Sequence, residues 1–366
     1  MGDIMRKEDK KLEKLKQAEL VFKNYKKEKI KIIENNLKLQ GINKAKFYFP
    51  ITKLLLNILT KLNGEKIYYL NEKNVKTPKE RPIIYANTHK FKPDLEKISL
   101  SVNKPSVLVA SDFKNSYKTI SGWYFNTRPT IFVDPYSKED KNHTYKMMVR
   151  YLKEGNNFMI FPEAVWNLSQ NKIVLDIFSG TVRAALESNA VVVCTAIERY
   201  GKNYVINRNG FFDPTEILKK YTDKSFDEIN NDSSYSELRK KIIDECNSKL
   251  RDKLGTLTYE IWEAYSNKYG LASRKSLKED YWENFIKELT QEWSGYKLSD
   301  NIEQQFQNEK EIEQQNIETD IKNLKNNLNI NNLFLFTDYD RYEKARYLIE
   351  NYKCEEKSKV KVLKRN

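Results

Sequence analysis

Short apolar runs alternate with longer mixed segments between residues 66 and 210, as in a sheet whose strands are separated by helices. Seven runs predict strands: 67–70, 82–86, 106–110, 130–133, 158–161, 191–198 and 204–207. Helices are expected between some of them, at 94–102, 138–154 and 179–188. The pattern predicts an α/β domain with a mixed, largely parallel sheet flanked by helices. In such a sheet, ligands bind in the loops beyond the strand ends.

Residues 47–62 predict a strongly amphipathic helix, with Pro50 in its first turn. Large aliphatic residues recur there at spacings of three and four: Ile51, Leu54, Leu55, Ile58, Leu59 and Leu62. One interpretation packs this stripe on the core of the domain. The other lays the helix in the surface of a bilayer. The membrane interpretation is favoured because the stripe is purely aliphatic, adjoins Phe47, Tyr48 and Phe49, and has basic flanks.

The composition changes at both ends of the α/β region, where helical extensions are expected. After Pro214 the chain becomes polar and predicts long helices, beginning with 234–268. We therefore divide the chain into three parts: a basic amphipathic arm at 1–65 that binds a membrane surface, the α/β domain at 66–235, and a helical extension of unassigned role at 236–366.

The net charge of +14 is concentrated near the start of the sequence. Residues 1–80 hold 20 Lys and Arg against 10 Asp and Glu, so they supply +10 of it. A basic arm is either a solvated face or a surface for an acidic partner, which an anionic membrane or a nucleic acid could provide. The lysines lie in helices without a nucleic-acid recognition motif, so we expect an anionic membrane surface and no nucleic acid.

Three cysteines, Cys194, Cys246 and Cys354, are scattered and lack a metal-binding spacing, which fits a reducing compartment and predicts no metal site. The first residues are too charged for a signal peptide. No apolar run approaches the length of about 20 residues that a membrane span needs. We therefore expect a peripheral protein on the cytoplasmic face of the membrane, without a transmembrane span.

The candidate chemistry lies at His89, which follows the apolar strand 82–86 at a predicted strand end. Asp94 comes five residues later, after a loop that contains Pro93. A carboxylate that holds one ring nitrogen leaves the other free to accept a proton from a hydroxyl, as a general base does. The alternative is a helix-capping aspartate beside an unrelated histidine. The other histidine, His143, stands among polar residues and is expected on the surface.

Two further blocks favour the catalytic interpretation. Phe161, Pro162 and Glu163 follow another predicted strand, 74 positions after His89, so both blocks can meet at one edge of the sheet. The block Phe178-Ser179-Gly180 opens the helix expected at 179–188 with a small N-terminus, which suits an oxyanion or a phosphate.

Asn87-Thr88-His89 through Asp94 resembles the first motif of the glycerolipid acyltransferases, the lysophosphatidic acid acyltransferase superfamily, and Phe161-Pro162-Glu163 resembles the third, normally Phe-Pro-Glu-Gly. The resemblance implies transfer of a fatty acyl group from acyl-CoA or acyl carrier protein to a hydroxyl of a lipid acceptor. It implies His89 as base, Asp94 as its orienting group and no bound cofactor. Glu163 would shape the acceptor pocket. The other substrate-binding candidates are Asn87, Phe161, Pro162, Gly180 and Arg128.

The sequence departs from the family where arginines usually hold the acceptor phosphate. In the second motif of the family, an arginine normally follows a strand, whereas Arg128 precedes the corresponding strand here. In the third motif, Ala164, Val165 and Trp166 follow Glu163 where Gly-Thr-Arg is common. We therefore expect an acceptor other than lysophosphatidic acid, such as another lysophospholipid or a glycolipid. The alternative function is an inactive or repurposed relative that binds lipid without turnover.

Overall fold

The structure is a computed structural model. It describes residues 2–37, 42–71, 75–90, 94–102, 104–111, 113–118, 124–125, 129–164, 167, 174–200 and 202–269. The part of the C-terminal extension beyond residue 269 therefore lies outside the described residues.

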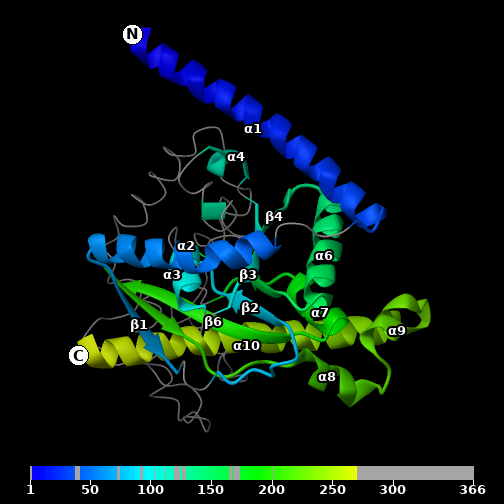
Figure 1. Ribbon diagram of the computed structural model, residues 1–366. Coiled ribbons are helices and arrows are strands. Elements are labelled where there is room, and N and C mark those ends of the chain that lie inside the picture. The colour runs from blue at the N-terminus through cyan, green and yellow to red at the C-terminus, as the bar shows by residue number, and fades with distance from the viewer. Residues whose placement is uncertain are drawn as a thin grey trace, which may run out of the picture.

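A seven-stranded sheet forms the centre of the molecule (Figure 1). Its strands are β1 (Lys66–Leu70), β2 (Ile83–Asn87), β3 (Ser106–Ala110), β4 (Thr130–Phe132), β5 (Asn157–Ile160), β6 (Val191–Tyr200) and β7 (Asn203–Asn207). They lie in the order β1-β7-β6-β2-β5-β3-β4, and only the β6–β7 pair is antiparallel. The predicted mixed, largely parallel sheet is confirmed, and each strand begins and ends within two residues of its prediction.

Successive residues of a strand point to opposite sides of the sheet, and apolar side chains lie on both sides here. Helices cover both faces. One face packs against α3 (Asp94–Ser101), and α2 (Ile42–Leu62) lies outside α3. The other face is covered by α6 (Lys138–Lys153), α7 (Gly180–Ser188), α8 (Pro214–Tyr221), α9 (Phe226–Asn231) and α10 (Ser236–Tyr269). Figure 1 shows α2 above the sheet and α10 below it. Two short helices are α4 (Phe113–Ser116) and η2 (Ser233–Tyr235).

The long helix predicted at 234–268 is confirmed as α10, and the hydrophobic core continues into it past residue 235. Buried apolar residues follow one stripe of this helix and pack with the sheet: Cys246, Leu250, Leu254, Leu257 and Ile261. Residues 236–269 therefore help to bury one face of the sheet.

Helix α1 (Gly2–Glu34) is anchored by a buried lysine. Lys29 Nζ lies 2.7 Å from Asp140 Oδ1 and donates to the Phe132 carbonyl and to Thr144 Oγ1, both at 2.9 Å. Burial lowers the pKa of Lys29, and the Asp140 carboxylate opposes that shift. These contacts tie α1 to β4 and α6.

Helix α2 packs with its polar side toward the protein. Thr52 and Thr60 are buried, and Lys53 Nζ donates to the Val102 carbonyl at 3.2 Å. Lys97 Nζ of α3 donates to Thr60 Oγ1 at 3.0 Å. The apolar side is turned outward, so the interpretation that packs it on the core is wrong. Among the described residues, no helix combines the length and the hydropathy that a membrane span requires.

Two local expectations are wrong. Pro50 lies in the interior of α2, because the helix begins at Ile42; a proline costs a helix one hydrogen bond but does not by itself end it. His143 is buried rather than exposed. The period of α6 places it on the same face as Met147, which packs into the core.

Candidate active site

His89 and Asp94 lie at the edge of the sheet where β2 ends and α3 begins. His89 Nδ1 is 2.8 Å from Asp94 Oδ2. The His89 side chain is 20% exposed, whereas that of Asp94 is 0% exposed. The pair is therefore open to a substrate on the histidine side and closed on the carboxylate side.

The Asp94 carboxylate is fixed by the backbone as well as by the ring. Its Oδ2 also accepts a hydrogen bond from the Lys90 N–H at 2.8 Å. An ionised carboxylate can only accept hydrogen bonds, so Nδ1 must carry the proton that it donates to Asp94. The lone pair of the neutral ring then lies on Nε2. The arrangement can remove a proton from a hydroxyl that approaches Nε2.

Glu163 is buried and holds the backbone of the site. Its Oε1 accepts from the His89 N–H at 2.9 Å, and its Oε2 accepts from the Leu175 N–H at 2.8 Å. Each carboxylate oxygen of Glu163 thus accepts from a main-chain N–H, one at His89 and one at Leu175. These contacts position His89, and the pocket-shaping role that the resemblance implied stays a prediction.

The remaining predicted residues around His89 are brought together by β2 and β5. The Phe161 ring lies 4.4 Å from the His89 ring, measured between centroids. Asn87 is buried and its Nδ2 donates to the Tyr85 and Ile160 carbonyls at 2.9 and 3.1 Å, which links the two strand ends. The Pro162 carbonyl accepts from the Phe178 N–H at 3.0 Å.

Gly180 begins α7, and a Cβ added there would meet no atom within 4 Å. Arg128, Val165 and Trp166 lie outside the described residues. The sequence interpretation missed the backbone contacts of Lys90, of Leu175 and of Asn167, whose N–H donates to the His89 carbonyl at 2.6 Å. No sequence signal could have found them, because a main-chain donor is the same in almost every residue type.

Ala164 occupies the position where the family motif has glycine, and it adopts a left-handed φ of +59°. Because a Cβ disfavours this conformation by about 1–2 kcal/mol, Ala164→Gly is expected to raise the free energy of unfolding by about 1 kcal/mol, measured by urea denaturation. The control Ala184→Gly, in the right-handed helix α7, should lower it by about 1 kcal/mol. A loss of stability in Ala164→Gly contradicts the strain.

Comparisons with known proteins show what this chain is similar to. Residues 66–198 match the family model described as Acyltransferase. An acyltransferase of Schizosaccharomyces pombe described as uncharacterized is 20% identical over 177 residues, which are 48% of this chain and 57% of that relative. The solved structure of a 1-acyl-sn-glycerophosphate acyltransferase, PlsC, from Thermotoga maritima aligns with 67% of this chain and 97% of its own, at 15% identity and a TM-score of 0.39.

The chain thus spans little more than half the length of the relative in Schizosaccharomyces pombe. The matched segment contains all of β2 and β5, the loop that joins β2 to α3, and Glu163. Residues 66–198 therefore form a segment that matches the acyltransferase family model, and its motifs resemble those of the glycerolipid acyltransferase superfamily.

Proposed function

We propose that this protein transfers a fatty acyl group from an acyl-thioester, acyl-CoA or acyl carrier protein, to a hydroxyl of a lipid acceptor. The observation that carries the proposal is the 2.8 Å contact between His89 Nδ1 and Asp94 Oδ2, inside the segment that matches the acyltransferase family. One carboxylate and one partly exposed imidazole are the groups that activate an alcohol.

In the proposed reaction, His89 Nε2 takes the proton as the acceptor oxygen forms a bond to the thioester carbonyl carbon. The carbon–sulfur bond then breaks, and the leaving thiolate takes the proton back from the imidazolium. Asp94 stabilises the transient positive charge on the ring. Glu163 acts as a positioning residue through the His89 N–H. The site residues need no covalent acyl-enzyme and no metal for these steps.

The acceptor we propose is a lysophospholipid with a head group other than a simple phosphate, or a glycolipid. Ala164 stands in the third motif where the family has glycine, and the arginine of that motif is replaced by Trp166 in the sequence. A head group that the family holds with arginines would therefore lack those partners here.

The experiment offers the full chain a radiolabelled acyl-CoA or acyl carrier protein together with vesicles of a total lipid extract. Labelled lipid that forms with either donor, and that increases with enzyme concentration, supports the proposal. Vesicle binding without any turnover of either thioester overturns it and establishes the alternative, a lipid-binding relative of the acyltransferases. Separation of the labelled products by head group then identifies the acceptor.

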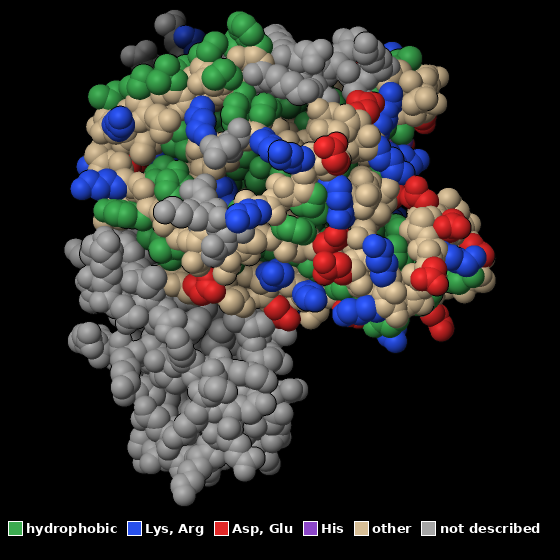
Figure 2. Space-filling model, turned by 60° about the horizontal axis from the view of Figure 1, so that its bottom comes forward, with side chains coloured by type: hydrophobic (Ala, Val, Ile, Leu, Met, Phe, Trp, Pro, Cys, Tyr) green, Lys and Arg blue, Asp and Glu red, His purple; other side chains and the backbone are tan. Residues whose placement is uncertain are grey.

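We further propose that α2 docks the domain on an anionic bilayer from one side. Its outward face carries large apolar residues that are 38–77% exposed: Phe47, Ile51, Leu54, Leu55, Ile58, Leu59 and Leu62. Figure 2 shows hydrophobic side chains gathered in a band along the upper edge of the molecule. Exposed apolar stripes of this size mark interaction surfaces, and lysines near an anionic leaflet add about 1 kcal/mol each. Since α2 packs on α3, docking also brings the Asp94 helix near the lipid.

The double variant Leu54→Asp/Leu59→Asp is expected to weaken binding to vesicles that contain anionic lipid by about a hundredfold in a sedimentation assay. Each leucine contributes about 1.5–3 kcal/mol when it leaves water. Leu20→Asp is the matched control, because Leu20 of α1 is 61% exposed and Leu54 is 60% exposed. An equal loss in both variants, or none in the double variant, excludes α2 as the docking helix.

A further inference from the structure

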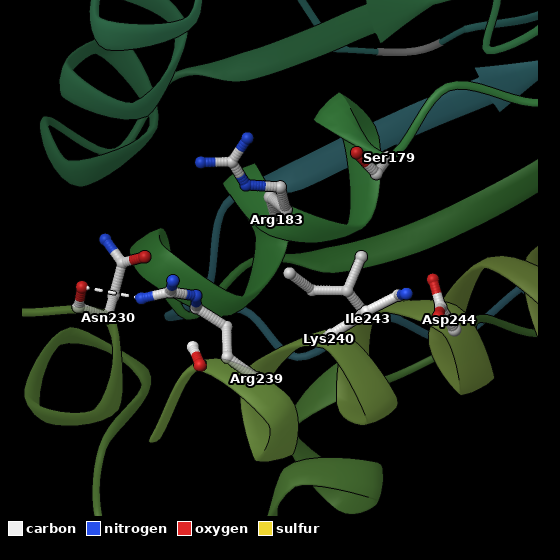
Figure 3. A pocket seen from close by; sticks show the side chains of 8 residues that line it. Ser179, Arg183, Asn230, Arg239, Lys240, Ile243 and Asp244 are labelled. Carbon is white, nitrogen blue, oxygen red and sulfur yellow. Dashed lines mark hydrogen bonds between the residues drawn. The ribbon is translucent and has the colours of Figure 1, made fainter. Parts of the chain in front are cut away.

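A pocket of about 590 Å³ lies between α7 and α10 on the face of the sheet opposite α2. Its volume falls within the range of about 300–1,000 Å³ that is usual for small-molecule sites. Figure 3 shows Ser179 and Arg183 on α7, with Asn230 to one side and the α10 residues below. The α10 residues that line it are Ser236, Arg239, Lys240, Ile243 and Asp244.

The pocket is basic, and two of its three cations already have a contact within the protein. Three of its side chains are cationic and one, Asp244, is a carboxylate. The Arg183 guanidinium stacks 4.8 Å from the centre of the Tyr145 ring. Arg239 Nη1 donates to the Asn230 carbonyl at 2.9 Å, which fixes the guanidinium and leaves further N–H donors (Figure 3). In the part of the chain that the structure describes, no carboxylate forms an ion pair with Arg183 or Lys240.

The start of α7 adds a second favourable feature. Ser179 is the N-cap residue, and its side chain makes no capping hydrogen bond. Backbone N–H groups in the first turn of a helix attract anions, and phosphates above all. Two arginines, a lysine and a helix N-terminus thus point to a ligand with several negative charges.

The pocket connects to the catalytic loop but lies away from the proposed membrane face. Ser179 follows Phe178, whose N–H donates to the Pro162 carbonyl, and Pro162 precedes Glu163, which accepts from the His89 N–H. The helices that form the pocket pack on one face of the sheet, whereas α2 and α3 lie on the other. With α2 docked on a bilayer as proposed, the pocket faces away from the membrane, so a water-soluble ligand fits this position better than a membrane lipid.

We propose that this pocket binds the phosphate-bearing nucleotide of an acyl-CoA donor, an inference that rests on the proposed acyltransferase function. The nucleotide carries several phosphate charges, and Ile243 and the arginine planes offer contacts for its base. The volume of the pocket is in the range of small-molecule sites, so we assign it to the nucleotide rather than to a carrier protein. The acyl-CoA thus enters from the α7–α10 side, and the lipid acceptor enters from the α2 side.

The test compares the full chain with Arg239→Gln/Lys240→Gln, using acyl-CoA and the matching acyl-pantetheine, which has the same thioester but no nucleotide. The KM for acyl-CoA is expected to rise at least tenfold, while kcat and the KM for acyl-pantetheine stay within about twofold. Arg183→Gln provides a second variant with the same expected direction. The control Lys241→Gln/Lys249→Gln removes the same charge from exposed positions of the same helix.

Equal changes with both donors mean that the residues act through the fold, and they overturn the proposal. So does an unchanged KM for acyl-CoA, or a loss seen only with acyl carrier protein. Calorimetric binding of free CoA separates this inference from the proposed function. If the wild type transfers no acyl group but binds CoA at least tenfold more tightly than the variant, the function fails and the site stands. If the wild type does not bind CoA, the site fails.

Discussion

His89→Ala is expected to lower kcat for acyl transfer by about 10²–10⁴-fold, because the variant loses the general base while the surrounding backbone contacts remain. Glu163 binds the N–H of residue 89, and Asn167 donates to its carbonyl, so the loop is held by groups that alanine also has. The KM for the thioester should change little. Initial rates at saturating donor measure the effect.

Asp94→Asn should reduce kcat within the same range of about 10²–10⁴-fold, since an amide can donate to Nδ1 and favour the wrong tautomer. His143→Gln is the control, because His143 is the other histidine of the chain and lies on α6. It should retain kcat within about twofold. A His89→Ala variant that is as active as the wild type would remove His89 from the mechanism.

Lys29→Met is expected to lower the free energy of unfolding by about 3–5 kcal/mol, because it leaves the buried Asp140 carboxylate without its counter-ion. Lys29 also donates to the Phe132 carbonyl and to Thr144 Oγ1, and both acceptors lose that bond. Urea denaturation, followed by far-ultraviolet circular dichroism, measures the change.

The double variant Lys29→Met/Asp140→Asn should recover much of this loss. Asparagine removes the buried charge and keeps an oxygen that can accept the Asp134 N–H, which Asp140 Oδ2 accepts at 2.8 Å in the wild type. Lys27→Met, on an exposed position of α1, is the control and should change stability by less than about 0.5 kcal/mol. Equal stabilities of Lys29→Met and the wild type would show that α1 is not anchored by this pair.

The sheet could be predicted because each strand is a short apolar run bounded by polar loops, and that pattern depends only on local sequence. The contact of His89 with Asp94 was also predictable, since His89 follows β2 closely and Asp94 begins α3 only five residues later. The hydrogen bond from the His89 N–H to Glu163 was not predictable, because it joins residues 74 positions apart through a main-chain group. His143 was misplaced because Lys141 and Asn142, which precede it, are exposed, whereas His143 and Thr144 are buried.

The orientation of α2 shows a further limit of sequence patterns. An aliphatic stripe fits a protein core or a bilayer, and its composition and flanks favour the bilayer without fixing which way the helix turns. That information comes from Lys53 and Lys97, whose contacts with the Val102 carbonyl and Thr60 turn the polar side inward. The prediction that residues 1–65 bind a membrane stays a prediction, and the vesicle assay above tests it.

The outward leucines of α2 have a consequence for kinetics once the domain is docked as proposed. An enzyme held on a bilayer meets its acceptor by lateral diffusion within two dimensions and completes many turnovers on one vesicle before it leaves. Its rate then follows the mole fraction of acceptor in the membrane rather than the bulk concentration. Diluting the acceptor with inert lipid slows such an enzyme even when the total amount of acceptor is unchanged, and the acylated product accumulates in the vesicle where it was made.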